Sequence, residues 1–191
     1  TCEVNFSRMM SDLQKISPGD VLLLHGCCHN PTGANLSLEN WTELTQFCEK
    51  KNILPLIDLA YQGFGDGIND DVKGVQYMAS NLPEVCIGIS CSKNFGLYRE
   101  RVGAALMVVS DKKIHKLVEE NLKSFNRVTF SFPPDYGASL VEIILGGNNS
   151  QNKELIHLWE KELNSMRNGM LVLRKLLSDS LRRSTNSTRL D

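Results

Sequence analysis

Four short apolar runs, separated by helical patterns, constrain the fold of this chain more than any other feature. The runs cover residues 21–25, 53–58, 85–90 and 102–109. The segments before and between the first three runs carry apolar residues at three- and four-residue spacing, which is typical of amphipathic helices. This alternation favours an α/β fold with a mostly parallel sheet and helices on both faces. The connection to the fourth run is short, which leaves an antiparallel pairing open there.

The remaining elements follow from periodicity and from capping residues. Ser37 is a typical helix N-cap, with Asn40 at the position where a capping box usually has glutamate. Pro55 argues mildly against a central place for the second strand, because proline cannot donate to the ladder. Residues 127–134 read as extended chain that ends in a rigid Pro-Pro turn. Helices are predicted over 6–16, 37–52, 70–82, 111–125 and 136–145, and a long one over 155–177.

Composition narrows the class of partner. The 191 residues are 41% hydrophobic and 23% charged, with a formal net charge of −1, which fits one soluble domain or a domain with part of another. Near-neutral charge gives no case for nucleic acid or an anionic membrane, and no apolar run approaches the roughly 18 residues of a membrane span. The six cysteines lack CxxC spacing and are predicted to be free thiols in a reducing compartment, and no metal site is predicted.

Polar side chains follow three of the predicted strands. Asn30 comes after the first, Asp58 and Tyr61 come at the end of the second, and Lys93 follows the third, with Arg101 beyond it. The carboxyl ends of parallel strands meet at one edge, where open α/β sheets bind ligands. Each residue also has an ordinary explanation by itself: a strand-to-helix turn for Asn30, a helix cap for Asp58 and a solvated loop lysine for Lys93.

Together, these residue types describe one kind of site. A partly desolvated lysine amine can form an imine with a carbonyl compound. An aspartate can keep a ring nitrogen protonated, tyrosine and asparagine can bind a phenolate oxygen, and arginine pairs with phosphate bidentately. The set therefore predicts a site for pyridoxal phosphate.

Several motifs of the chain resemble those of the aspartate aminotransferases, which are fold-type I pyridoxal-phosphate enzymes. They are His-Asn-Pro-Thr-Gly at 29–33, Asp-Leu-Ala-Tyr-Gln-Gly-Phe-Gly at 58–65, Ser-Lys-Asn-Phe-Gly-Leu-Tyr at 92–98 and Glu-Arg-Val-Gly at 100–103. The resemblance covers nearly the whole chain, in order, and it implies the three-layer fold of that family. The sequence around the lysine is most similar to the animal cytosolic branch, which implies a cytoplasmic location.

The resemblance also implies roles for individual residues that bind the cofactor. Lys93 would carry the cofactor as an imine and act as the general base that moves the substrate's proton. Asp58 would pair with the pyridinium nitrogen, and Tyr61 and Asn30 would bind the ring oxygen and keep the pKa of the imine low. The phosphate would be held by Ser90 and Arg101.

For the substrate, the resemblance assigns Arg127 and Asn30. Arg127 would reach into the neighbouring subunit of a homodimer and grip the side-chain carboxylate of a dicarboxylic amino acid, a grip that suits a planar guanidinium. Without the resemblance, Arg127 would be read only as a charge at the end of a strand.

Some positions depart from the family pattern. Phe132 stands where an asparagine is usual, Arg99 replaces a neutral polar residue and Cys91 replaces an aromatic one, and the loop at 146–150 is longer than expected. Phe132 is close in sequence to Arg127, so it bears on the preference for dicarboxylic substrates. These departures favour a divergent paralogue of the cytosolic enzyme.

The resemblance implies that residues 1–153 form part of the large cofactor-binding domain, and that 154–191 form a bridging helix and the start of a truncated small domain. The chain opens on Thr1 rather than methionine and ends in a polar tail, so we expect it to be incomplete. The arginine that binds the substrate's α-carboxylate has no counterpart here. We therefore expect the 191-residue chain alone not to be a competent transaminase.

The function expected for the full-length protein is transfer of the amino group of L-aspartate to 2-oxoglutarate, which gives oxaloacetate and L-glutamate. Racemisation or β-decarboxylation of aspartate stays open, because these reactions share the carbanion step. A non-catalytic paralogue that serves as a dimerisation or regulatory partner also stays open, since Phe132 and Arg99 depart from the pattern.

Overall fold

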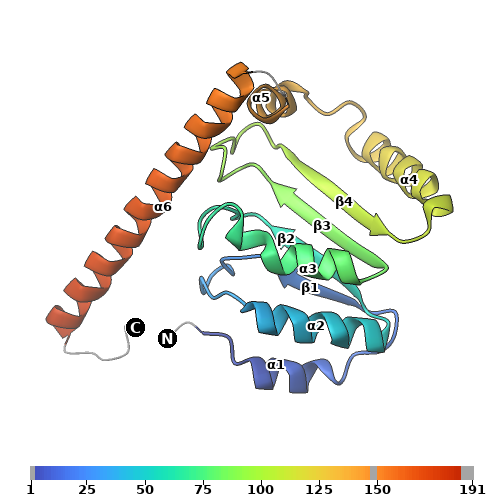
Figure 1. Cartoon of the computed structure of the whole chain (residues 1–191), viewed down its shortest axis with the longest axis horizontal. Helices are drawn as coiled ribbons and strands as arrows, with labels where there is room; N and C mark the ends of the chain where they lie inside the picture. Colours follow the sequence, from blue (N-terminus) through green and yellow to red (C-terminus); the bar gives the residue numbers. More distant parts are fainter. Residues whose placement is uncertain (1–2, 147–149, 186–191) are drawn as a thin grey trace.

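The computed structural model describes residues 3–146 and 150–185, which form a mixed four-stranded sheet with helices packed on it. The strand order is β1 (Val21–His25), β2 (Leu54–Leu59), β3 (Glu84–Ser90) and β4 (Gly103–Val109). The first three strands are parallel, and β4 runs antiparallel to β3 (Figure 1). The predicted α/β alternation is therefore confirmed, including the antiparallel fourth strand.

Pro55 lies in the interior of the sheet, between β1 and β3, in spite of its missing N–H. The N–H of Leu54 donates to the carbonyl of Asp20 on the β1 side, at 3.1 Å. The nitrogen of the next residue, Pro55, therefore faces β3. Pairing of β2 with β3 begins only at Leu56, so Pro55 occupies a position where no ladder bond is lost.

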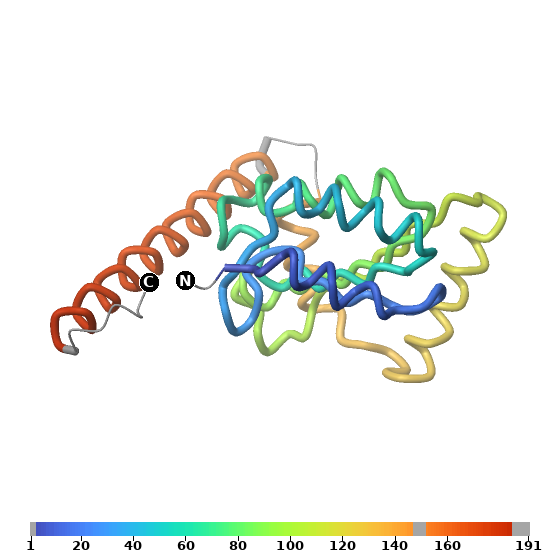
Figure 2. Tube along the Cα trace, turned by 90° about the horizontal axis from the view of Figure 1, so that it is seen from below, coloured from blue at the N-terminus to red at the C-terminus, as the bar shows by residue number. Residues whose placement is uncertain are grey.

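Two helices, α2 (Leu38–Lys51) and α3 (Lys73–Asn81), cover one face of the sheet, and a 3-10 turn, η1 (Asp70–Val72), leads into α3 (Figure 2). Helix α1 (Phe6–Leu13) lies beyond β1, at the edge of the sheet and next to α2 (Figure 1). Alternate strand residues and the inner faces of α2 and α3 form the buried core, and apolar side chains of α1 pack against it. Its members include Leu22, Leu24, Ile57, Val85, Ile87, Trp41, Leu44 and Met78.

The opposite face of the sheet is open in the described residues, so the predicted helices are observed on one face. Val21, Leu23 and Leu56 point to that side and are 55%, 61% and 39% exposed. Strands β1, β2 and β3 are consecutive both in the chain and in the sheet. Right-handed crossovers that progress in one direction place their helices on the same face, so α2 and α3 cannot also cover the other one.

Helix α2 begins at a capping box in which asparagine takes the usual place of glutamate. The Oγ of Ser37 accepts the N–H of Asn40, and Oδ1 of Asn40 accepts the N–H of Ser37, both at 3.2 Å. Two N–H groups that the helix itself cannot satisfy are thus paired.

Replacing Ser37 with alanine removes one of these two acceptors. We expect the free energy of unfolding to fall by about 1 kcal/mol, the usual size of a lost N-cap. Urea titration of both proteins measures this difference. Ser80→Ala, on the exposed surface of α3, is the matched control and should stay within about 0.5 kcal/mol of the original. Equal losses in the two variants would contradict the assignment of the cap.

Helix α4 (Lys112–Phe130) is longer than predicted, and residues 127–130 are helical rather than extended. The β-branched and aromatic residues at 128–130 favoured a strand, but no neighbouring strand pairs with them in the described residues. Their backbone groups are satisfied within the helix instead, up to the bond from the N–H of Ser131 to the carbonyl of Arg127. Leu117 and Leu122 of this helix are 57% and 37% exposed.

The last two helices are α5 (Tyr136–Leu145) and α6 (Ser150–Thr185). The predicted long helix is confirmed and starts earlier than expected. It leans along the side of the molecule where β1, β2 and β3 end (Figure 1). Residues 147–149 of the predicted 146–150 loop lie outside the described residues. In the part of the chain that the structure describes, no helix is both long and apolar enough to cross a membrane.

Candidate active site at the carboxyl edge of the sheet

Register brings the ends of the three parallel strands together. His25 pairs with Asp58, which pairs with Gly88, and the N–H of Gly26 donates to the carbonyl of Asp58 at 2.8 Å. The loops that follow these strands therefore leave the same edge of the sheet. These loops carry Asn30, Tyr61 and Lys93, so the structure places the predicted residues at one edge.

Lys93 and Tyr61 come from different loops and are in direct contact. The Nζ of Lys93 lies 4.5 Å from the centroid of the Tyr61 ring, a cation–π distance. Both side chains are half-buried. In the described residues, Lys93 forms no ion pair and donates no hydrogen bond, so its amine is available to a ligand.

Asp58 and Asn30 are exposed at the same edge. Asp58 alternates with the buried Ile57 and Leu59 along β2, so it shares the open face with Leu56. Neither the Asp58 carboxylate nor the Asn30 amide has a hydrogen-bond or salt-bridge partner within residues 3–146 and 150–185. The Asp58 carboxylate and the Asn30 amide are thus free to bind a ligand at this edge.

Ser90 and Arg101 are brought together by the β3–β4 hairpin. Ser90 pairs with Gly103, two residues after Arg101. The Oγ of Ser90 accepts the N–H of Ser92 at 3.2 Å, and a guanidinium N–H of Arg101 donates to the carbonyl of Tyr98 at 3.1 Å. Arg101 has a φ of 51°, an uncommon conformation that clusters at ligand-binding sites. A serine hydroxyl and a guanidinium near a strand end can hold an anion.

Arg127 does not join this cluster. It lies in the last turn of α4, and its Cζ is 4.0 Å from the centroid of the Phe132 ring. Phe132, which is close to Arg127 in sequence, therefore also contacts it in space. Of the seven predicted site residues, the structure gathers six at the sheet edge and leaves Arg127 on a separate surface.

Trp159 of α6 is a neighbour of the lysine that the sequence did not reveal. Its indole Nε1–H donates to the carbonyl of Asn94 at 2.8 Å, and its ring stacks on Phe95 with centroids 4.5 Å apart. These contacts fix the two residues directly after Lys93. A tryptophan on an amphipathic helix predicts burial, but its partner, more than sixty residues away in sequence, could not be identified.

Asp71 was also missed. Its carboxylate is 7% exposed and accepts hydrogen bonds from the backbone of the loop after Tyr61. The only sequence signal is an aspartate shortly after a glycine-rich turn. Because Asp70 stands beside it, the sequence does not tell which of the two points inward.

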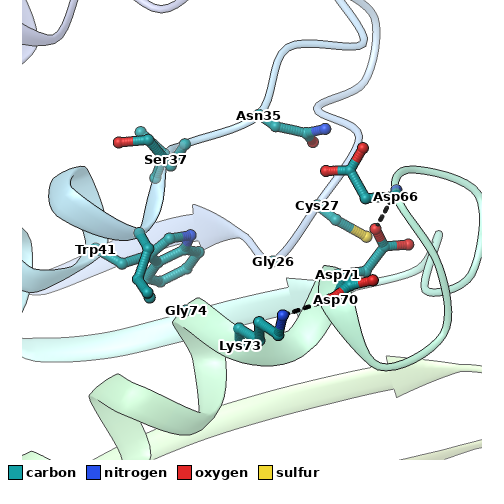
Figure 3. Close-up of a pocket in the computed structure, with 12 residues that line it drawn as sticks. Gly26, Cys27, Asn35, Ser37, Trp41, Asp66, Asp70, Asp71, Lys73 and Gly74 are labelled. Carbon is teal, nitrogen blue, oxygen red and sulfur yellow. Dashed lines mark hydrogen bonds and ion pairs between the residues drawn. The ribbon is translucent and has the colours of Figure 1, made fainter.

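A cavity of about 300 Å³ lies next to Asp71 and is lined by none of the seven predicted residues (Figure 3). Its lining includes Cys27, Trp41 and Lys73, and Lys73 is ion-paired with Asp70 at 2.5 Å. A hydrogen bond between the adjacent thiols raises the pKa of Cys27, to which burial and the Asp71 charge also contribute. The same bond lowers the pKa of Cys28. The chemistry of the sheet edge, rather than this cavity, marks the candidate site.

All five cysteines within the described ranges are free, as predicted, and Cys2 lies outside them. A search of the described residues found no group of three or more histidine, cysteine, aspartate or glutamate side chains that could hold a metal ion. The candidate site is therefore assembled from lysine, tyrosine, aspartate, asparagine, serine and arginine.

Comparisons with known proteins agree on one family. The chain is 48% identical over 186 residues to an aromatic-amino-acid aminotransferase of Paracoccus denitrificans, covering 97% of this chain and 46% of that protein. It is 40% identical over 178 residues to an aspartate aminotransferase of Escherichia coli, covering 93% of this chain and 44% of the relative. The chain thus spans about half the length of the curated relatives it matches.

Solved structures give the same result. A crystal structure of the aromatic-amino-acid aminotransferase from Burkholderia pseudomallei, covalently bound to pyridoxal phosphate, superposes with a TM-score of 0.91 at 33% identity. The match covers 99% of this chain and 46% of that one. The profile of the family described as aminotransferase class I and II matches residues 1–189. The chain therefore belongs to the class I and II aminotransferase family.

Proposed function

We propose that the whole protein carrying this chain is a pyridoxal-phosphate-dependent aminotransferase, with Lys93 as the residue that links covalently to the cofactor. The observation that carries the proposal is the contact of Lys93 with Tyr61, at the same sheet edge as an Asp58 carboxylate that has no partner in the described residues. An imine-forming amine and a phenol from two loops, with an unpaired carboxylate near the end of β2, are what a pyridine aldehyde requires.

The residues present fit the cofactor as a set. The Asp58 carboxylate would accept a hydrogen bond from the ring N–H, and Tyr61 and Asn30 would hold the ring oxygen. Ser90 and Arg101, joined by the β3–β4 hairpin, would hold the phosphate. When bound, the cofactor supplies an electron sink for the bond broken at the substrate's Cα.

The chain's own residues then have separate tasks. Lys93 would act as the base that takes the proton from the substrate's Cα and delivers it to the cofactor-side carbon of the same imine. Asp58 keeps the ring nitrogen protonated, because its carboxylate has no competing partner among the described residues. Tyr61 orients the lysine through its ring and the cofactor through its hydroxyl.

For the substrate, we propose a dicarboxylic amino acid whose side-chain carboxylate is held by Arg127 of the neighbouring subunit in a homodimer. This fits the position of Arg127 on α4, away from the cluster at the edge of its own sheet. A second candidate is an aromatic amino acid. It is favoured by the contact of Arg127 with Phe132, and by the 48% identity to an aromatic-amino-acid aminotransferase.

Replacing Arg127 with leucine in the whole protein separates the two candidates. A charge-assisted pair is worth about 1.5–3 kcal/mol, so kcat/KM for aspartate should fall by about 10- to 100-fold. The value for an aromatic amino acid should change little. Arg8→Leu, which replaces an exposed arginine of α1, is the control. An equal loss for both substrates would contradict a role for Arg127 in selecting the side chain.

The test of the reaction itself is a half-reaction. Loaded whole protein mixed with L-glutamate, without any acceptor, should release one equivalent of 2-oxo acid per site. Bound cofactor without release of 2-oxo acid from aspartate, glutamate or an aromatic amino acid would favour the non-catalytic paralogue instead.

The architecture of the whole protein is part of the same proposal. We expect three layers, with further chain covering the open sheet face that exposes Leu23 and Leu56. Residues 1–153 would belong to the large domain, and 154–191 would form the bridging helix and the start of a small domain. The free cysteines fit a cytoplasmic protein.

A further inference from the structure

The backbone of residues 63–67, here called the glycine loop, is wrapped around a single carboxylate. Oδ2 of Asp71 accepts the N–H groups of Gly63 and Gly65, at 2.7 and 3.0 Å. Oδ1 accepts those of Asp66 and Gly67, at 2.7 and 3.3 Å. Figure 3 shows the Asp71 side chain directed at the Asp66 backbone. Four donors on one carboxylate that is 7% exposed fix the path of this loop.

The glycine loop is continuous with Tyr61. The N–H of Phe64 donates to the carbonyl of Tyr61 at 3.0 Å and closes a turn. Gly63, inside that turn, is bound directly by Asp71. The position of the Tyr61 backbone is therefore tied to the Asp71 carboxylate through two hydrogen bonds in sequence.

Neighbouring side chains pack closely against the loop. A Cβ at Gly65 would lie 2.5 Å from Oδ1 of Asp71, and a Cβ at Gly63 would lie 2.5 Å from Cδ2 of Leu163 on α6. Leu163 is 2% exposed. The loop is thus packed between Asp71 on one side and α6 on the other, with little freedom to shift.

Asp70 is the natural comparison. It stands next to Asp71, its side chain is 52% exposed, and it forms a surface ion pair with Lys73. The two aspartates have the same charge and nearly the same place in the chain. Of the two, Asp71 binds the loop that leads to Tyr61, and the Tyr61 ring lies beneath the amine of Lys93.

We propose that Asp71 is a positioning residue for the reaction: by binding the four amides of the glycine loop, it holds Tyr61 against Lys93 and in reach of the cofactor's ring oxygen. The inference rests on the proposed function. A hydrogen bond from the Tyr61 hydroxyl to the ring oxygen stabilises its negative charge and so favours loss of the proton from the imine. If Asp71 holds Tyr61 in place, losing Asp71 should make that proton harder to remove.

The test follows the visible absorbance of the loaded whole protein as a function of pH. Asp71→Asn places an amide N–H₂ against two N–H donors, so the loop should loosen and the titration midpoint should rise by about one pH unit. Gly65→Ala, which displaces the carboxylate without removing it, should raise the midpoint in the same direction. Asp70→Asn is the matched control and should leave the midpoint unchanged.

Combination with Tyr61→Phe decides whether Asp71 acts through the tyrosine. That change alone should raise the midpoint, and Asp71→Asn should add nothing further in its presence. Amide hydrogen exchange of residues 63–67, measured on the same variants, should be faster in Asp71→Asn than in the original protein if the loop has loosened. If Asp71→Asn does not fold, Gly65→Ala carries the test.

Faster exchange of the loop with an unmoved midpoint in Asp71→Asn would overturn the proposal, because Asp71 would then serve the fold alone. A shift that persists in full in the Tyr61→Phe background would overturn it as well. If the original protein shows no cofactor band at any pH, the proposed function fails instead, so the two failures are distinguishable.

Discussion

Lys93→Ala is expected to abolish the visible band that the whole protein forms with pyridoxal phosphate, and with it transamination. The variant loses the amine that forms the covalent link and the base that moves the substrate's proton. General-base catalysis alone contributes about 10²- to 10⁴-fold, so turnover should fall by at least that factor. Spectral titration with the cofactor and a steady-state assay measure the two effects.

Lys113→Ala is the control for this experiment, because Lys113 is exposed on α4 and contacts no residue of the candidate site. It should keep both the band and the rate. A Lys93→Ala protein that retains an imine band would mean that another lysine carries the cofactor, and the site at the sheet edge would be wrongly assigned.

The second large effect is expected for Asp58→Ala. Asp58 is exposed in this chain, and we expect the cofactor and the rest of the whole protein to cover it. Leaving one member of such a covered ionic pair without its partner costs roughly 3–5 kcal/mol, and each 1.36 kcal/mol is a tenfold change in rate. We therefore expect kcat to fall by about 10²- to 10⁴-fold, since the ring nitrogen is no longer kept protonated. The covalent band should persist, because Lys93 is intact.

Asp135→Ala controls for the loss of a carboxylate, since Asp135 is exposed and its side chain does not cap α5. Stopped-flow measurement of the half-reaction separates the effect on proton transfer from that on cofactor affinity. An unchanged kcat in Asp58→Ala would show that this carboxylate does not keep the cofactor's ring nitrogen protonated during the reaction.

Local pattern was enough to predict much of the fold. The apolar runs at 21–25 and 85–90 are strands β1 and β3, and the capping signal at Ser37 marks the start of α2. Asp58 and Lys93 lie at the same edge because β2 and β3 are parallel, so both strands end on that side of the sheet. The spacing of apolar residues and the order of the strands were enough to predict these features.

Other features depend on what packs against a segment, and local pattern does not contain that information. Residues 127–130 have strand-forming side chains, yet they are helical because no strand lies beside them in the described residues. The open sheet face has the same apolar residues that a covered face would have. Asp71 and Asp70 differ only in which one the chain turns inward, and Trp159 reaches Asn94 from a distant helix.

The central claim is that Lys93 is the covalent anchor, and reduction followed by peptide mapping tests it most directly. Whole protein loaded with pyridoxal phosphate is treated with borohydride, digested and analysed by mass spectrometry. We predict that the pyridoxyl phosphate mass lies on Lys93 at close to one per chain. Modification of another lysine at that level, or no modification of Lys93, would contradict the account.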